Sequence, residues 1–358
     1  MKKKLHVLIA ILAGSFAFAQ DIETPAFSGI TFGGSADAYY KYDFSKQDNG
    51  LSSFTNTQDS FEIGMASINA GHSFGKASVF VDLGFGTRAE QFSYNEKDTK
   101  FIVKQLTFTY DITDKFKVVA GSFGTHIGYE VLDAVDNKNY SMSYAFSCGP
   151  FFNTGVKAQY TSGQFTAMAG ITNPTDFNSA LDSGSKKKTY IGQLGYVADK
   201  GSVYLNFTTG SANPSPGSEI PLPNERKTEF DLVVSREITD SFSLGFNGVY
   251  AKTTNEIDKE LGGEWYSLVG YANYSFRESL ILAYRMEYFG AKKAAATIGN
   301  LSGANVFANT VSLNYKVGKL TIIPEVKYDI ASEKIYVDNN TLATGGMFFA
   351  LLATTYSF

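Results

Sequence analysis

Four charged side chains lie within nine positions of one another in the middle of the chain: Glu130, Asp133, Asp136 and Lys138. Carboxylate and ammonium groups that face water in a narrow passage attract or repel ions as they go by. The four residues belong to residues 121–150, a mixed apolar and polar segment that is longer than a turn requires. The chemistry they indicate is the sorting of solutes by charge, with no covalent bond made or broken.

The same segment allows a second interpretation, a calcium site. Asp133, Asp136 and Asn137 carry the oxygen atoms that Ca²⁺ prefers, but their spacing does not follow a calcium-loop pattern. The chain also contains no nucleotide loop and no zinc-binding histidine pair. We therefore predict no metal and no cofactor.

A hydrolase would need a nucleophile beside a general base that a third group orients. Beyond the first twenty residues, His72 and His126 are the histidines of the chain. Ser73 follows His72, but neighbours in a strand point to opposite faces, so they form no dyad without a bulge. We predict that the protein is not an enzyme.

Alternation of charged and apolar residues indicates the strands that would face the charged segment. In residues 226–238, Lys227, Glu229 and Asp231 alternate with Phe230 and Leu232. In a barrel one face would meet lipid and the other the lumen. Both signs occur on the predicted lumen face, which predicts weak selectivity with a cation preference at most. The predicted lumen wall charges are Lys41, Asp82, Asp231, Arg285, Glu325 and Lys327, with Asp37, Asp43, Glu229, Glu287, Asp329, Arg88, Lys157 and Lys227.

The last thirteen residues, 346–358, read as a strand with Phe348, Leu352, Tyr356 and Phe358 on one face. A closed membrane barrel must pair its last strand with its first, because an unpaired edge is costly in lipid. The segment resembles the final strand of bacterial outer-membrane proteins, so Tyr356 and Phe358 are candidates for the signal read by the barrel-assembly machinery. The alternative is a buried strand in a soluble sheet.

The first nineteen residues, 1–19, have the order of a secretory signal peptide. Lys2, Lys3 and Lys4 precede an apolar run that ends in Ala17-Phe18-Ala19. Removing them changes the formal net charge from -4 to -7, and a mildly acidic exported chain is a poor candidate for nucleic-acid binding. We predict that residues 20–358 form a single domain.

Composition and turns favour an all-β transmembrane antiparallel barrel with short periplasmic turns and long outer loops. The chain has 30 Phe, 22 Tyr and 34 Gly, and Tyr and Phe gather at the ends of strands as in the aromatic girdles of membrane barrels. Seven short turns recur about every 40 residues. The predicted strands are residues 30–44, 60–73, 76–87, 101–112, 115–124, 151–161, 164–173, 188–198, 201–210, 226–238, 241–253, 264–276, 278–289, 305–316, 319–330 and 346–358, sixteen in all.

Two places fit the pattern poorly. Pro324 lies inside the fifteenth predicted strand, where it removes a ladder donor and predicts a bulge. The second strand loses its alternation after Met65.

Residues 121–150 also carry a family resemblance. The segment is similar to the β-barrel porins of the OmpL-like family common in Bacteroidota, which share a Gly-Phe-Gly stretch, an Ile-Gly-Tyr-Glu segment and a Ser-x-Ser-Tyr pair before a Gly-Pro. That resemblance implies a pore and no defined substrate. The matching residues are Gly121, Phe123, Gly124, Ile127, Gly128, Tyr129, Glu130, Asn139, Tyr140, Ser141, Ser143, Tyr144 and Pro150.

We expect residues 121–150 to fold inward and narrow the channel, as long functional loops do. The alternative is a lid over the barrel mouth or a contact with a neighbouring subunit. The sequence thus predicts a porin for passive diffusion of small hydrophilic solutes in the outer membrane of a Gram-negative bacterium. Its expected partners are lipid, lipopolysaccharide, the barrel-assembly machinery and copies of itself in a homotrimer. The other candidate function is a non-conducting barrel that acts as a surface scaffold or adhesin.

Overall fold

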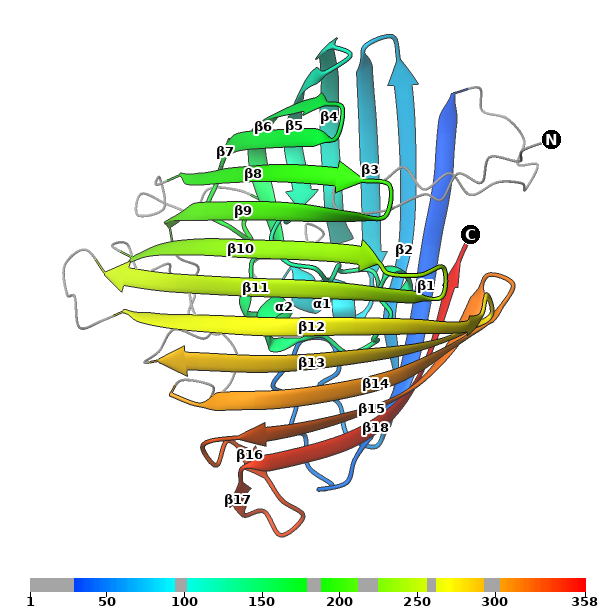
Figure 1. Cartoon of the computed structure of the whole chain (residues 1–358), viewed down its shortest axis with the longest axis vertical. Helices are drawn as coiled ribbons and strands as arrows, with labels where there is room; N and C mark the ends of the chain where they lie inside the picture. Colours follow the sequence, from blue (N-terminus) through cyan, green and yellow to red (C-terminus); the bar gives the residue numbers. More distant parts are fainter. Residues whose placement is uncertain (1–28, 94–101, 179–187, 212–224, 256–261, 293–302) are drawn as a thin grey trace.

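Sixteen antiparallel strands close into one barrel in the computed structural model, which describes residues 29–93, 102–178, 188–211, 225–255, 262–292 and 303–358 (Figure 1). The predicted fold class is therefore confirmed. The predicted signal peptide lies outside the described residues. The barrel strands are β1 (Ile30–Asp43), β2 (Ser60–Phe74), β3 (Ala77–Phe85), β4 (Val103–Thr113), β5 (Phe116–Gly124), β6 (Phe152–Ser162), β7 (Phe165–Thr172), β8 (Thr189–Ala198), β9 (Gly201–Ser211), β10 (Glu225–Glu237), β11 (Phe242–Asn255), β12 (Gly263–Arg277), β13 (Leu280–Lys292), β14 (Asn305–Val317), β15 (Leu320–Ala331) and β18 (Gly346–Ser357).

The seam of the barrel joins the first strand to the last, as the terminal segment predicts. β1 pairs with β18 from Ser35 opposite Ser357 to Asp43 opposite Phe349. The backbone of Gly34 and that of Phe358 exchange two hydrogen bonds of 3.2 and 3.0 Å. The ladder therefore has no open edge, which lipid would leave unsatisfied.

Short turns and long loops separate at the two ends of the barrel. Six of the seven short turns contain two residues, and the β10–β11 turn contains four. Gly75 and Gly318 adopt positive φ values of 59° and 63° in two of these turns, a backbone region that glycine enters without strain. Barrels of the bacterial outer membrane place such turns in the periplasm and their long loops outside the cell.

The outer surface of the barrel is apolar. Phe230, Leu268, Met286 and Leu352 are all exposed, and each belongs to the apolar face of its strand. A soluble sheet would bury that face, whereas a lipid-facing wall leaves it uncovered by protein. No helix in the described ranges is long and apolar enough to cross a membrane.

The second strand loses its alternation because of a bulge one residue before the predicted point. The register with β1 shifts so that Asp37 pairs with Met65 and Ala38 with Ile63, which leaves Gly64 as the extra residue. The bulge predicted at Pro324 is wrong. β15 keeps one register with β18 across the proline, where Pro324 pairs with Leu352.

The lumen is filled on one side by segments from the long-loop end. Two short helices, α1 (Thr87–Phe92) and α2 (Tyr144–Cys148), and the 3-10 turn η2 (Ala134–Asp136) lie within the ring of strands, behind β10 to β13 in the view of Figure 1. A small hairpin, β16 (Tyr336–Val337) with β17 (Ala343–Thr344), forms a separate sheet at that end. These helices and this hairpin were not among the predicted elements.

An apolar cluster ties these segments together. It consists of Phe54, Phe92, Met142, Phe146, Phe151 and Phe152. Its members come from the first long loop, α1, residues 125–151 and the start of β6. Burial of so many aromatic rings fixes the segments on one another, since each ring removes a large apolar area from water.

Candidate functional site

Residues 125–151 enter the lumen and lie against its wall, and we call them the inward loop. The loop begins at the end of β5 and returns to the start of β6. Tyr140 and Tyr144 are 0% exposed although both belong to a loop. Polar groups of the loop backbone are therefore removed from bulk water, and each needs a partner on the wall.

Three wall carboxylates supply those partners, and we call Asp231, Glu287 and Glu325 the anchor carboxylates. Glu325 on β15 accepts the backbone N–H groups of Tyr140 at 2.6 Å and Ser141 at 3.1 Å. It also accepts the hydroxyl of Ser312 at 2.7 Å. Both carboxylate oxygens are thereby used, which holds the middle of the loop to β15.

Glu287 on β13 holds the start of α2 in the same way. Its carboxylate oxygens accept the backbone N–H groups of Tyr144 at 2.8 Å and Ala145 at 2.7 Å. Ser143 caps the helix, because its hydroxyl accepts the N–H of Phe146 at 3.0 Å. The first three N–H groups of this short helix are therefore satisfied.

Two phenols add side-chain contacts to the backbone contacts. The Tyr140 hydroxyl donates to Asp37 on β1 at 2.5 Å, and the Tyr144 hydroxyl donates to Asp329 on β15 at 2.6 Å. Burial raises the pKa of both tyrosines well above the ordinary value. Both phenols therefore keep their protons at neutral pH and remain donors.

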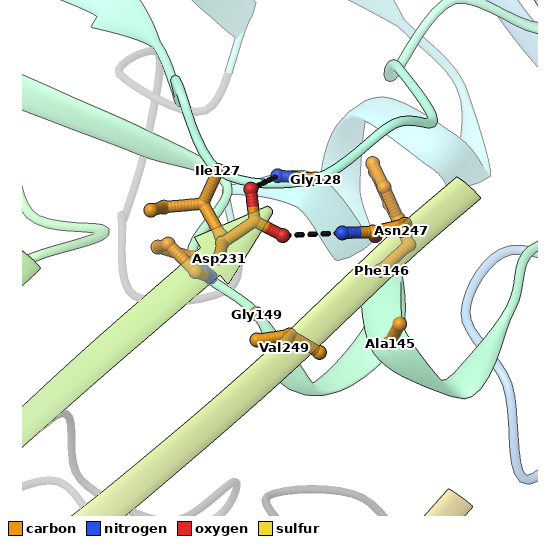
Figure 2. A pocket seen from close by; sticks show the side chains of 9 residues that line it. Ile127, Gly128, Ala145, Phe146, Gly149, Asp231, Asn247 and Val249 are labelled. Carbon is orange, nitrogen blue, oxygen red and sulfur yellow. Dashed lines mark hydrogen bonds between the residues drawn. The ribbon is translucent and has the colours of Figure 1, made fainter. Parts of the chain in front are cut away.

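The third anchor carboxylate holds the beginning of the inward loop. Asp231 on β10 accepts the N–H of Gly128 at 3.1 Å and also hydrogen-bonds Asn247 on β11 (Figure 2). A cavity of about 10 Å³, the size that one water molecule needs, lies beside this contact. Its lining includes Ala145 and Val249, so it is too small and too apolar to be a solute site.

His126 fixes the same end of the loop. Its Nε2 atom lies 3.0 Å from the carbonyl oxygen of Phe207 on β9. Burial lowers the pKa of the imidazole to about 4. His126 is therefore neutral at physiological pH, and its contact with a strand carbonyl helps to hold the start of the inward loop.

Glu130, one of the four predicted loop charges, does not face water. It is 5% exposed and forms an ion pair with Arg285 on β13, Nη1 to Oε1, at 2.5 Å. The Arg285 guanidinium also donates to the carbonyl oxygen of Ser141 at 2.5 Å and to the hydroxyl of Thr310 at 3.0 Å. Glu130 of the loop and Arg285 of the wall therefore lie together as predicted. Their ion pair holds the loop to β13 and does not face the channel.

Asp133 forms a second link between loop and wall. Both of its carboxylate oxygens lie 2.8 Å from the ammonium of Lys104 on β4, and Lys104 lies 2.9 Å from Asp82 on β3. Ser67 on β2 donates to Asp133 at 3.0 Å. Lys104 thus bridges Asp133 of the loop and Asp82 of the wall, which were expected on opposite sides of the channel.

Asp136 and Lys138 are the two predicted loop charges that remain exposed. The turn that presents them is rigid, since the Asn137 side chain bonds both backbone groups of Val131, at 3.1 and 2.6 Å. Asn139 donates to Ser312 on β14 at 2.7 Å. The exposed charges therefore stand on a fixed support inside the barrel.

The calcium interpretation has no support in this arrangement. Asp133 is occupied by Lys104, and the side chain of Asn137 by the backbone of Val131. Within the described residues, no group of three or more potential His, Cys, Asp or Glu ligands comes together.

Lys41 and Lys327 lie apart from the inward-loop charges they were expected to face. The ammonium of Lys41 donates to the carbonyl oxygen of Thr55 at 2.9 Å, beneath the first long loop. Lys327 lies 3.3 Å from the Ser52 hydroxyl and 3.4 Å from Asp329. Both are about 0–1% exposed, so neither meets a solute in this arrangement.

Tyr356 and Phe358 lie outside the lumen. Both are exposed on the apolar face of the seam at the short-turn end, with ring centroids 6.4 Å apart. They are therefore separate from the inward loop.

Sequence reasoning missed Lys104 and the tyrosine contacts. In a regular strand Lys104 would lie on the same face as Leu106 and Phe108, and that alternation predicts a lipid-facing side chain. A register shift between β3 and β4, at Asp82 and Leu83, turns it inward. A lysine at an apparent lipid-facing position is itself the signal for such a bulge, because an ammonium there is costly.

A comparison with protein-family models identifies the family of this chain. The family described as "Putative beta-barrel porin-2, OmpL-like" matches residues 29–358. The chain belongs to this family. A comparison with curated protein sequences found no match.

Solved structures with the same fold are outer-membrane proteins of Gram-negative bacteria. "Outer-membrane expressed OmpT of Vibrio cholerae" aligns with a TM-score of 0.58 and 13% identity, covering 92% of this chain and 97% of that chain. The anion-selective porin from Comamonas acidovorans aligns with a TM-score of 0.62 and 11% identity, covering 92% and 99%. Salmonella typhi OmpF, in complex with daunomycin, aligns with a TM-score of 0.60 and 13% identity, covering 92% and 97%.

The similarity to these solved structures concerns the fold alone, whereas the family match assigns the chain to a class of outer-membrane barrels. This member of the OmpL-like β-barrel porins is an outer-membrane protein of a Gram-negative bacterium, and family and fold together support an outer-membrane channel.

Proposed function

We propose that the protein is a porin for the passive diffusion of small hydrophilic solutes, with the inward loop as its constriction. The observation that carries the proposal is the position of Asp136 and Lys138. They are exposed inside a closed sixteen-strand barrel, on a loop that the anchor carboxylates hold to one side of the wall. Solutes would pass between that loop and the remaining wall, sorted by width and charge.

The selectivity of this channel is weak in our proposal. Many of the wall charges counted from the sequence are neutralised by a partner on the wall or on the inward loop, as in the pairs Arg285–Glu130, Lys227–Glu229 and Lys327–Asp329. A buried pair presents little net field to a passing ion, so a few exposed groups decide the preference.

The test is single-channel conductance of the refolded protein in a planar bilayer. Deleting Asp133 to Asn139 removes the exposed charges and the link to Lys104 but keeps the contacts of Glu130 and Tyr144 with the wall. We expect the conductance to rise, because the deleted residues occupy the lumen. Deleting Asn339 and Asn340, exposed in the β16–β17 turn, is the matched control and should leave conductance unchanged.

A non-conducting scaffold is the second candidate, and one observation favours it. The first long loop covers Lys41 and Lys327 while the inward loop covers the anchor carboxylates, so a large part of the wall is closed to solutes. Absence of current from a protein shown to be a folded barrel, with surface binding unaffected by the loop deletion, would select this function over the porin.

Its partners follow from the same proposal. The apolar outer surface would contact lipid and lipopolysaccharide, and Tyr356 with Phe358 would be read by the barrel-assembly machinery. One solved structure with the same fold, OmpT of Vibrio cholerae, is described as a trimer form. We extend that arrangement to this chain as a homotrimer.

A further inference from the structure

Two lysines, Lys117 on β5 and Lys157 on β6, face the lumen away from the anchor carboxylates. Their strands place Val118 and Val156 on the outer face, so Lys117, Val119 and Lys157 share the inner face. Lys117 pairs with Gln159, and Lys157 with Val119, which makes the two lysines diagonal neighbours across the ladder. Such neighbours are about 7 Å apart, close enough to repel.

Lys157 is a partly buried cation held by an aromatic ring instead of a carboxylate. Its ammonium lies 4.0 Å from the centroid of the Phe123 ring. In the part of the chain that the structure describes, no carboxylate lies within ion-pair distance of it. Gly170, opposite Lys157 on β7, leaves it room, since a Cβ there would lie 2.9 Å from the Lys157 Cβ.

Lys117 has one acid in register, Asp111 on β4. Asp111 is exposed at the short-turn end, and among the described residues it makes no ion pair with Lys117. His126, the other titratable group near Lys157, is neutral at physiological pH. Among the described residues, neither lysine of this patch therefore forms an ion pair with an acid.

Five of the other lumen cations are paired with a carboxylate, and a sixth, Lys41, is buried beneath the first long loop. Arg285, Lys104, Lys227, Lys327 and Arg88 each lie within 4.0 Å of a wall or loop carboxylate. An unpaired, partly desolvated cation gains more from a mobile anion than a paired one does.

We propose that Lys117 and Lys157 form an anion subsite in the channel, for small solutes that carry a carboxylate or phosphate group. The inference rests on the proposed channel function. It specifies the weak selectivity of that channel as a preference for anions. Lys117 and Lys157, both half-buried, place two positive charges without an ion-pair partner on the lumen wall. The channel therefore prefers anions, the reverse of the preference expected from counting wall charges in the sequence.

The test is the reversal potential of the refolded wild-type barrel under a potassium chloride gradient, and again with potassium phosphate. We expect anions to be preferred over potassium in both salts. In the double variant Lys117→Gln with Lys157→Gln, the anion-to-cation permeability ratio should fall by at least roughly threefold, because a single unit charge about 7 Å from one ion already produces that factor in water. Lys115→Gln in the β4–β5 turn is the matched control and should leave the ratio unchanged.

The outcomes separate the two proposals. A folded wild-type barrel without current overturns the channel function itself. A conducting barrel whose ratio is the same in wild type and double variant overturns the anion subsite alone. A heat-modifiable shift on an unboiled gel shows that each variant is folded before its current is measured. A fall in the ratio for chloride and not for phosphate would overturn the assignment to phosphate and carboxylate solutes.

Discussion

Glu130 and Arg285 form a buried ion pair between the inward loop and strand β13, with an Nη1 to Oε1 distance of 2.5 Å. Glu130 follows β5 by six residues, whereas Arg285 lies on β13, eight strands further along the chain. The pair therefore forms only when the loop lies against the opposite wall of the barrel. It is neither a catalytic dyad nor a charge that solutes meet.

Replacing Glu130 tests that fastening. In Glu130→Gln the Arg285 guanidinium keeps Ser141 and Thr310 but loses its counter-charge, and removing one partner of a buried pair costs about 3 kcal/mol or more. We expect a lower free energy of unfolding in urea, a noisier single-channel current and faster proteolysis within the loop.

An exposed ion pair of the same barrel gives the control for Glu130. Glu264 and Lys292 are 2.9 Å apart, with side chains 30% and 70% exposed. Water screens such a pair, so Glu264→Gln should change neither stability nor current noise measurably. Equal effects of the two substitutions would contradict a fastening role for Glu130.

Gly64 predicts a steric effect on the same loop. A Cβ at this bulge residue would lie 1.8 Å from the Asp37 carboxylate and 2.7 Å from the Tyr140 hydroxyl. Gly64→Ala should therefore break the hydrogen bond between Tyr140 and Asp37 and lower stability by about 1–3 kcal/mol, the usual cost of overpacking. Single-channel conductance should rise as Tyr140 leaves the wall.

Gly270 on β12 is the matched glycine, because a Cβ there would meet nothing within 4 Å. Gly270→Ala should leave conductance unchanged and stability equal or slightly higher, since alanine costs less backbone entropy in a strand. If Gly64→Ala behaved like Gly270→Ala, the close packing of Asp37, Gly64 and Tyr140 would be in error.

His126 predicts a pH dependence of stability. Burial lowers its pKa to about 4 in the folded protein, against about 6.5 in an unfolded chain. Between those values the unfolded chain binds a proton that the folded protein does not, so stability falls as the pH falls from 6.5 towards 4. The loss between pH 7.5 and pH 5 is about 2 kcal/mol.

The measurement is urea unfolding of the refolded barrel at pH 7.5 and at pH 5. His126→Gln keeps a donor for the Phe207 carbonyl but cannot take up a proton, so its stability should differ less between the two pH values than that of the wild type. His72→Gln on β2, outside the inward loop, should retain the wild-type difference. An unchanged pH dependence in His126→Gln would show that other groups cause it.

Much of the barrel could be predicted from the sequence because lipid on one side and water on the other impose strict alternation. Strand ends agree within a few residues, as in residues 226–238 against Glu225–Glu237. The pairing of the final strand with β1 followed from the cost of an open edge. The loss of alternation near Met65 corresponds to the Gly64 bulge, whereas the prediction failed at the Lys104 bulge and at Pro324, where the expected bulge is absent.

The site was harder to predict, because alternation shows which face a charge lies on but not which partner it finds. Glu130 and Asp136 look alike in the sequence, yet one is buried against Arg285 and the other is exposed. The difference arises from the path of the inward loop, which positions Glu130 opposite a guanidinium on a distant strand. Nothing local to either residue encodes that path.

The seam between β1 and β18 has a consequence for the order of folding. Ser35 meets Ser357, so the contact that closes the ring joins residues more than three hundred positions apart. Contacts of such sequence separation form late, because the entropy of the intervening chain is lost before they stabilise anything. Without β18 the sheet would have two open edges, one at β1 and one at β15. Pairing of β1 with β18 is therefore expected to be a late step in the folding of this barrel.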